Sequence, residues 1–434
     1  MPSFSKLLQA TGCITLENSC HELTHPWNPS CLGAIKEILP HGLQCSFKTY
    51  ATFYGLTCLL KIARGKKIHR RELIKDILRS TVFLTTNFLA FVYASCLLRR
   101  LFGCYFSSSY YIAATIGSFL AIIQETERRR PALALYLTNL ASESVFYQMK
   151  NRGYVKEVPN GLTIMFSIGL GVLSYFKSKG IKSDIHGLIN LTHSLGNGEK
   201  IPYYKKLPEV MKNAIETVRS KLSKGDRCNH QHSCAANVLE SSVVNFGYGL
   251  SATVIIALIK NVNSPRKLVQ SLMKSETLSL PIFTALMPGI YHTVNCLLKR
   301  LPLLSDTFTE TAAGLASGAA MLAWPNLTIS MYILWKAIER VYHLAADKGY
   351  APRFKYGEII LYSIVTGYIV GNCIVEPHAI RKGYYFNFIR GLSDNHFDYV
   401  DRKLLLPFGF DSDKLYREGT ILVKPMSKMT NSAF

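Results

Sequence analysis

Long apolar runs bounded by basic residues dominate the chain. Six stretches carry no Asp, Glu, Lys or Arg over about the length that an α-helix needs to cross a bilayer, roughly 20 residues. A soluble core helix usually keeps charge on its solvent face, whereas these runs lack it all round. They therefore predict a polytopic membrane protein with six or more spans. The runs are 80–98, 101–124, 158–176, 241–259, 277–298 and 359–375.

An internal repeat makes four further segments credible as helices. Residues 132–175 align without a gap on residues 328–371, with 11 identities in 44 positions. The motif Cys-Leu-Leu-basic-Arg-Leu also occurs twice, at 96–101 and at 296–301. Hydrophobicity alone does not align a Glu, a Gly-Tyr pair and a Cys-led basic pair in the same order, so the repeat indicates a duplication. The four segments are 44–60, 131–149, 311–323 and 327–346.

The predicted fold class is all-α: a polytopic membrane helical bundle built from two homologous repeats of about five helical segments each. If all five segments cross the membrane, the second copy is inverted relative to the first, a construction that transporters use around midplane sites. If the first segment of each copy lies on the membrane surface, the copies are parallel. The expected parts are an N-terminal Cys/His segment (1–40), the first membrane repeat (41–180), a polar connector with a second Cys/His cluster (181–240), the second membrane repeat (241–376) and a basic C-terminal tail (377–434).

Charge narrows the class of partner. The 434 residues include 50 Lys and Arg against 28 Asp and Glu, a formal net charge of +22. Basic residues cluster at the ends of apolar runs, for example at 61–71 and 128–130, where they suit anionic lipid headgroups. A nucleic-acid-binding protein would instead show a basic stripe on a polar domain with stacking aromatics. We therefore expect the lipid bilayer and its anionic lipids as partners, and no nucleic acid.

Two groups of cysteine and histidine have a spacing that suits a metal ion. Thiolate and imidazole are ligands that zinc prefers, and each group offers two of each. The odd total of 11 cysteines disfavours a full disulfide framework. Local disulfides (Cys20 with Cys31, Cys228 with Cys234), idle thiols, a structural zinc and a catalytic metal all stay open, and no other cofactor is expected. The first group is Cys20, His21, His25 and Cys31, and the second is Cys228, His230, His232 and Cys234.

Ionisable residues inside apolar segments are costly in a membrane and mark candidate functional positions. Glu143 and Glu339 are equivalent in the repeat alignment, and Lys336 and Arg340 flank the second of them. A symmetric pair of acids that faces the bundle interior could bind a proton or a polar headgroup. The alternative is that these helices leave the bilayer early and that the charges are hydrated or paired structurally.

Small residues concentrate in the third segment of each repeat. Gly117 lies in the first copy, and Gly314 and Gly318 form a Gly-x3-Gly pattern in the second. Such patterns let helix backbones approach closely, so we favour helix packing over a ligand path. The chain has no nucleophile elbow, P-loop, zinc-protease or dinucleotide motif, and we therefore expect a protein that is not an enzyme.

Three motifs resemble the transmembrane protein 135 family. The pattern Cys-x4-His-x-Trp-x-Pro-Ser-Cys spans 20–31, and the tract 127–144 combines three arginines with Leu-Tyr-x2-Asn-Leu-Ala-x-Glu. The stretch Thr-Ile-Ser-Met-Tyr at 328–332 is similar to that family too. The resemblance covers nearly the whole chain. It implies a multi-pass protein of mitochondrial and peroxisomal membranes, more distantly similar to the mitochondrial inner-membrane translocase family.

The resemblance also implies a function. It points to mitochondrial division, with the division machinery as a partner, and to lipid homeostasis, including cholesterol movement to peroxisomes, and it offers no catalytic residues to carry over. Our first hypothesis is a non-enzymatic organelle membrane protein that regulates mitochondrial dynamics and lipid homeostasis. A second is a carrier or channel for a lipid or small solute, with a midplane site between the repeats. A third is a membrane scaffold that recruits partners through its basic loops.

Overall fold

The chain is helical, as the sequence predicts. The computed structural model describes residues 13–63, 69–181, 224–260 except 229, 231 and 232, and 272–419, with a few isolated positions between 209 and 270. The only sheet in this described part pairs two short antiparallel strands, β1 (Thr15–Leu16) and β2 (Tyr105–Phe106). The chain forms two compact units: unit 1 comprises residues 1–156 and 353–434, and unit 2 comprises residues 157–352.

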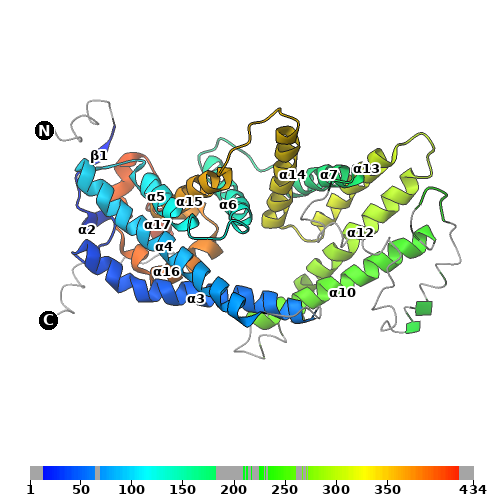
Figure 1. The fold of residues 1–434 in the computed structure, drawn as a ribbon, viewed down its shortest axis with the longest axis horizontal. Helices are drawn as coiled ribbons and strands as arrows, with labels where there is room; N and C mark the ends of the chain where they lie inside the picture. The colour runs from blue at the N-terminus through cyan, green and yellow to red at the C-terminus, as the bar shows by residue number, and fades with distance from the viewer. Residues whose placement is uncertain are drawn as a thin grey trace. The chain divides into compact units, whose positions relative to one another are not determined.

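Unit 1 is organised around two long neighbouring helices, α3 and α4. Its helices before the C-terminal segment are α2 (Cys20–Leu23), α3 (Cys31–Ala63), α4 (Arg70–Phe102), α5 (Ser109–Ile122), α6 (Arg130–Asn151) and α15 (Gly357–Val375). α5 packs against both α4 and α15, and α15 also packs against α6 (Figure 1). α4 ends at Gly103, whose φ of +73° suits a residue without a Cβ, and Arg99 and Arg100 in its last turn complement the helix dipole.

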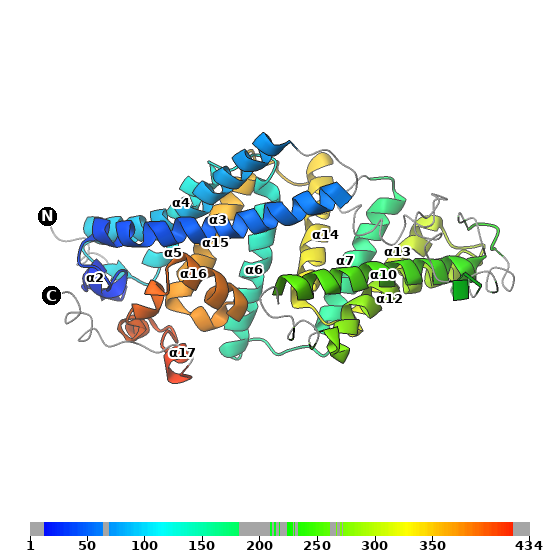
Figure 2. The ribbon, with the colours of Figure 1, turned by 90° about the horizontal axis from the view of Figure 1, so that it is seen from below.

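Unit 2 has a second set of neighbouring helices. Its elements are α7 (Gly161–Ser178), α10 (Cys234–Lys260), η2 (Ser275–Leu278), α12 (Ser279–Leu298), α13 (Asp306–Ser317), η3 (Gly318–Leu322) and α14 (Leu327–Asp347). α10 lies beside α12, α12 packs on α13, and α7 contacts both α13 and α14 (Figure 2). Phe166, Phe283, Met321 and Ile333 form the centre of its apolar core.

The compact units do not follow the predicted domain boundaries, because each unit takes its fifth long helix from the other half of the chain. α7 follows α6 in sequence but packs in unit 2, and α15 follows α14 but packs in unit 1. Each unit therefore has four consecutive helical segments plus one helix from the other half. The duplication itself stays a prediction. A duplicated chain would have the same order of helices in both halves, as is found here.

Four helices in the described part are long and apolar enough to span a membrane: α4, α7, the stretch Cys234–Leu258 of α10, and α15. Two of the six predicted spans, 101–124 and 277–298, are not among these four helices. The run 101–124 breaks at Gly103, and its helix α5 has only 14 residues, about 21 Å against a hydrocarbon thickness of about 30 Å. α12 has 20 residues but contains Pro288, His292 and Asn295.

The C-terminal segment is a folded part of unit 1 up to residue 419 rather than a tail. Its elements are η4 (Pro377–Ala379), the π-helical turn η5 (Tyr384–Ile389), α16 (Arg390–Leu392), η6 (His396–Tyr399), η7 (Arg402–Phe408) and α17 (Lys414–Arg417). Tyr385, Phe397 and Leu405 are buried in the same apolar core as α4 and α15. The burial of these apolar side chains explains why the segment folds against unit 1 despite the basic charge that suggested a tail.

Candidate functional site

Three thiols and one imidazole converge near the N-terminus of unit 1. The N-terminal cluster consists of Cys20, His25, Cys31 and Cys96, and their ligand atoms all lie within 4.8 Å of one another. The sulfurs of Cys20 and Cys31 are 3.4 Å apart. All four residues are buried or half-buried. The cluster joins the first residue of α2, the loop after α2 and the first residue of α3 to the penultimate turn of α4.

Local interactions fix the chain that carries this cluster. Ser19 and Glu22 form a capping box at the start of α2. The guanidinium of Arg99 donates to the carbonyl oxygens of Asn18 and Glu17, at 2.7 and 2.6 Å. The hydroxyl of Tyr110 donates to the carbonyl of Leu23 at 2.9 Å. These bonds hold the segment 15–25 against the end of α4 and the start of α5.

The tautomer and the burial of the His25 ring suit a metal ligand. Its Nδ1 lies 2.8 Å from the carbonyl oxygen of Asn28, and because that oxygen can only accept, Nδ1 carries the proton. Its Nε2 is buried and has no hydrogen-bond partner among the described residues. Burial lowers the pKa of His25 below its usual value, which favours the neutral ring. Nε2 is thus the atom that His25 offers to the thiols.

A second group of the same composition lies in unit 2. The central cluster consists of Cys228, His230, Cys234 and Cys296, again with all ligand atoms within 4.8 Å, and all four residues are buried. The sulfurs of Cys228 and Cys234 are 3.9 Å apart. The sulfur of Cys296 lies 3.4 Å from Nε2 of His230. Either cluster could therefore hold a metal ion such as zinc.

The structure changes the membership of both predicted groups. His21 is not in the N-terminal cluster, and His232 lies outside the described residues. In each cluster a distant cysteine supplies the fourth group instead: Cys96 and Cys296. Both open the repeated Cys-Leu-Leu-basic-Arg-Leu motif, so the sequence held a signal for them, although spacing alone could not show that a helix 65 residues away returns to the cluster.

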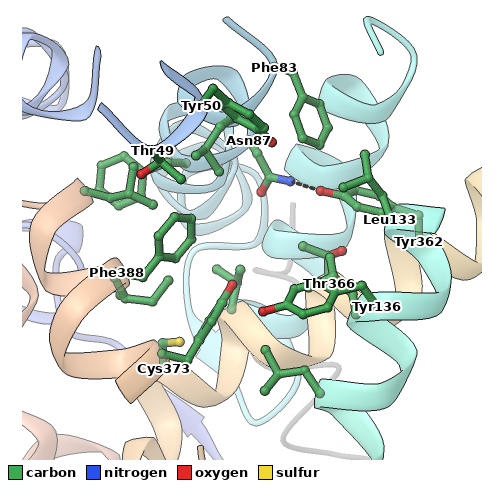
Figure 3. A pocket seen from close by; sticks show the side chains of 18 of the residues that line it. Thr49, Tyr50, Phe83, Asn87, Leu133, Tyr136, Tyr362, Thr366, Cys373 and Phe388 are labelled. Carbon is green, nitrogen blue, oxygen red and sulfur yellow. Dashed lines mark hydrogen bonds between the residues drawn. The ribbon is translucent and has the colours of Figure 1, made fainter. Parts of the chain in front are cut away.

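Unit 1 also contains a cavity of about 820 Å³, within the range of about 300–1,000 Å³ typical of small-molecule sites. Side chains of α3, α4, α6, α15 and η5 line it, and two of these helices, α4 and α15, are candidate membrane spans. Figure 3 shows Tyr50, Phe83, Tyr136, Tyr362 and Phe388 around it. The wall is mostly apolar, which suits a hydrophobic occupant.

A few polar groups interrupt this wall. The amide of Asn87 donates to the hydroxyl of Tyr362 at 2.9 Å (Figure 3). The hydroxyl of Thr366 lines the cavity, is buried, and has no hydrogen-bond partner in the described part of the chain. A buried hydroxyl without a partner is costly. An occupant with a hydroxyl or carbonyl group could satisfy it.

Basic side chains lie at both ends of the cavity along α6. Arg128 and Arg129, which immediately precede the helix, line it, and so does Arg381. Arg129 is held by Glu125 at 2.8 Å and lies 5.3 Å from the centre of the Tyr54 ring. Arg381 pairs with Glu143 on α6, 13 residues after the helix begins and so about 20 Å along it. The middle of the cavity is thus apolar, and it lies between the arginines at 128–129 and Arg381.

The two repeat-equivalent glutamates lie in different units and have different partners. Glu143 is buried, and both its oxygens accept from the guanidinium of Arg381. Glu339 is half-buried and accepts from Lys336, one turn earlier on α14, at 2.6 Å. Arg340 follows on the same helix. Both acids are therefore paired, which is the structural alternative that the sequence left open, and no described contact joins the two.

A buried polar network between α5, α6 and α15 was not anticipated. Gln148 donates to Asn372 at 3.0 Å and to Glu376 at 2.6 Å. Arg152 pairs with Glu376 at 3.1 Å, and the hydroxyl of Tyr111 donates to Asn372 at 2.9 Å. The available signal was that Glu376 directly ends the run 359–375.

The three predicted packing glycines lie where helices approach closely. A Cβ on Gly117 would be 2.7 Å from the backbone nitrogen of Phe91 on α4. A Cβ on Gly314 would be 2.9 Å from the carbonyl oxygen of Leu170 on α7, and one on Gly318 would overlap the backbone of Ser167. Each of these close approaches needs a residue without a side chain.

Comparison with known proteins agrees with these features. Residues 17–150 match a family described as the N-terminal cysteine-rich region of transmembrane protein 135. That range contains all four residues of the N-terminal cluster and most of the first four long helices. No solved structure matches the chain. The more distant similarity to mitochondrial inner-membrane translocases stays a prediction. The four apolar helices and the family match together identify an integral, multi-pass membrane protein whose residues 17–150 are similar to the N-terminal cysteine-rich region of transmembrane protein 135.

Proposed function

We propose that this protein is a non-enzymatic organelle membrane protein that binds a sterol or a single-chain lipid in the cavity of unit 1. The observation that carries this proposal is the cavity itself, about 820 Å³ of largely apolar space whose walls include two helices able to span a membrane, α4 and α15. A cavity at that position can receive its occupant from the bilayer.

The chemistry of the lining favours an amphiphile over a small polar solute. Apolar contact supplies about 0.8 kcal/mol for each CH₂ group removed from water, so a hydrocarbon body matches the middle of the cavity. The polar end of the ligand has two kinds of partner: the buried hydroxyl of Thr366, which suits the hydroxyl of a sterol, and the guanidinium group of Arg128, which suits a carboxylate or phosphate.

Exposed residues provide an entrance. Thr49, Phe53 and Tyr136 line the cavity and are exposed, with Phe53 exposed to 54% and Tyr136 to 46%. Their side chains are apolar or amphipathic, as expected where a ligand passes between lipid and protein. We propose that the occupant enters laterally past these side chains.

In cells, we propose that lipid binding connects the protein to mitochondrial division and to peroxisomal and mitochondrial lipid homeostasis, including cholesterol handling. The support for this step is the similarity of residues 17–150 to the N-terminal cysteine-rich region of transmembrane protein 135, together with the cavity. Partners of this function would be anionic lipids at the basic helix ends and the mitochondrial division machinery.

A photoaffinity experiment tests binding. The purified full-length chain in lipid nanodiscs is labelled with a photoactivatable sterol and, in parallel, with a photoactivatable fatty acid. Thr366→Phe, which fills the cavity, should reduce labelling at least tenfold. Ile364→Phe is the matched control, since Ile364 lies two residues away on α15 and is 57% exposed. Equal labelling of Thr366→Phe and the unsubstituted chain with both probes would refute the site.

A rescue experiment tests the cellular role. In cells that lack the protein, re-expression of the unsubstituted chain and of Ile364→Phe should restore mitochondrial length and the cholesterol content of peroxisomes. Thr366→Phe, at equal abundance in the same membranes, should fail to restore either. Full rescue by Thr366→Phe would separate the organelle phenotype from the cavity and refute this proposal.

A further inference from the structure

We infer that the chain binds two zinc ions, one in each unit, in closed Cys3His sites that join α3 to α4 in unit 1 and α10 to α12 in unit 2. The N-terminal cluster and the central cluster supply the ligands. The inference is independent of the lipid site, because no cluster residue lines the cavity.

The geometry of both clusters fits a tetrahedral zinc ion. With Zn–S bonds of about 2.3 Å and Zn–N bonds of about 2.0–2.1 Å, tetrahedral angles place two sulfurs about 3.8 Å apart and a sulfur and a nitrogen about 3.6 Å apart. The observed S···S separations are 3.4 Å between Cys20 and Cys31 and 3.9 Å between Cys228 and Cys234. The S···N separation of Cys296 and His230 is 3.4 Å.

The number of ligands argues against disulfides. A disulfide between Cys20 and Cys31 would explain two groups of the N-terminal cluster, but not the thiol of Cys96 or the imidazole of His25 beside them. A mononuclear zinc site uses all four. Four protein ligands also complete the coordination shell, which is typical of structural rather than catalytic zinc.

The N-terminal cluster has the outer contacts of a metal-bound histidine. Such a ligand usually donates its second ring N–H to a carbonyl or carboxylate, which fixes the tautomer. His25 does so through Nδ1 to the carbonyl of Asn28, at 2.8 Å. Its Nε2 is buried without a hydrogen-bond partner in the described chain, and a bound cation would remove that cost.

The two sites occupy equivalent places. Cys31 is the first residue of α3, and Cys234 is the first residue of α10, where the positive end of a helix dipole stabilises a thiolate. The remote ligands Cys96 and Cys296 lie near the ends of α4 and α12 and share one motif. The same arrangement at two positions in the chain is hard to explain by chance.

Both clusters have a pair of basic residues near the remote cysteine. Three thiolates and one Zn²⁺ leave a net charge of −1 at each site. A basic pair begins three residues after each remote cysteine, Arg99-Arg100 in one motif and Lys299-Arg300 in the other. Arg99 additionally binds the backbone carbonyls of residues 17 and 18. The motif thus combines a ligand with a compensating positive charge.

Metal analysis tests the inference directly. The full-length chain, purified in detergent without chelators, should contain two zinc ions per chain by mass spectrometry. Cys96→Ser and Cys296→Ser should each reduce the content to one, and the double substitution to none. Cys104→Ser is the matched control, because Cys104 is a buried thiol near the end of α4 but outside both clusters. Fewer than two ions in the unsubstituted chain, or no loss in either variant, would overturn the inference.

A histidine exchange separates a ligand role from a general loss of folding. His25→Ala should lose one zinc ion, whereas His21→Ala, four residues earlier, should keep both. His25→Cys should retain the metal, since it replaces one zinc ligand by another. X-ray absorption of the unsubstituted chain should show three Zn–S contacts and one Zn–N contact per ion. Loss of zinc in His21→Ala but not in His25→Ala, or a Cys20–Cys31 disulfide as the main form by peptide mapping, would refute the assignment.

Discussion

Gly153 and Gly349 have the same backbone conformation, with a φ of +78° at both positions. They end α6 and α14, and in each case a second left-handed residue, Asn160 or Tyr356, starts the next helix seven residues later. The turn before α7 therefore has the same conformation as the turn before α15. This agreement between distant segments is a local property of the chain and does not depend on how the two units are placed.

We predict that Gly153→Ala and Gly349→Ala each destabilise the protein. A residue with a Cβ pays about 1–2 kcal/mol in the left-handed region, so both variants should unfold at a lower temperature in detergent. Gly55→Ala should behave in the opposite way, because Gly55 lies inside α3 with nothing near its Cβ position, and Ala is preferred in helices by about 1 kcal/mol. A lower unfolding temperature for Gly55→Ala alone would contradict this assignment of the turns.

The ion pair of Glu143 and Arg381 should contribute more to stability than the pair of Glu339 and Lys336. Glu143 is buried, and its loss leaves a cation beside the cavity without its partner, at a cost of about 3 kcal/mol. Glu339 pairs within one partly exposed helix turn, so Glu339→Gln should cost less than about 1 kcal/mol. Thermal unfolding of Glu143→Gln, Glu339→Gln and the double variant Glu143→Gln with Arg381→Gln measures these effects. Equal losses in the two single variants would be inconsistent with the difference in burial.

Reconstituted flux distinguishes a structural pair from a transport site. If the two glutamates only hold helices together, folded Glu143→Gln and Glu339→Gln proteins in liposomes should move lipids and small solutes at the rate of the unsubstituted chain. A parallel loss of flux in both variants would revive the carrier hypothesis.

Gly117→Ala should destabilise the contact between α4 and α5. The added Cβ would lie 2.7 Å from the backbone nitrogen of Phe91, and a backbone atom cannot move away without shifting the helix, so we expect a cost of about 1–3 kcal/mol. Gly247→Ala serves as the control, because the Cβ position there is open. Hydrogen exchange of α5 amides reports the effect, and unchanged protection in a Gly117→Ala protein would argue against close packing.

Arg402→Met should unfold the C-terminal segment. The Arg402 side chain is fully buried, and it donates to the carbonyl of Ile374 at 2.9 Å and to the hydroxyl of Tyr385 at 2.7 Å. Removal leaves these groups unsatisfied, at a cost of about 1–3 kcal/mol for each. Limited proteolysis should then cut between residues 377 and 419, whereas Lys403→Met, at the exposed neighbouring position, should stay resistant. Equal resistance of both variants would count against a folded segment.

Hydropathy predicted both the helical class and the membrane character, because both depend on the local run of apolar residues, and the motifs predicted the family. Hydropathy was less informative about where a run breaks: Gly103 stops α4 through its left-handed conformation, and because a glycine and the serines at 107–109 carry no charge, they do not interrupt the charge-free run 101–124. The fate of the C-terminal segment was missed for a related reason. Its basic charge suggested a tail, while the buried contacts of Arg402 depend on carbonyl groups at the end of another helix.

Three of the four ligands in each metal-ligand set were predicted from the sequence. Cys20, His25 and Cys31 are close along the chain, so their spacing was informative, but it could not decide between His21 and His25. That choice depends on the hydrogen bond between His25 and Asn28, which only the folded loop defines. Cys96 could be found only by combining the repeated motif with the packing of α4 beside α3.

The exchange of α7 and α15 imposes an order on biosynthesis. Unit 2 is continuous, from residue 157 to residue 352, whereas unit 1 needs residues from both ends of the polypeptide. A ribosome that has translated only the first half has therefore delivered the four long helices α3 to α6 without the rest of unit 1. That half cannot complete its core until α15 and the C-terminal segment up to residue 419 have been made. Truncation of the chain anywhere before α15 would leave unit 1 incomplete, even though every residue of the cysteine-rich region, 17–150, had already been made.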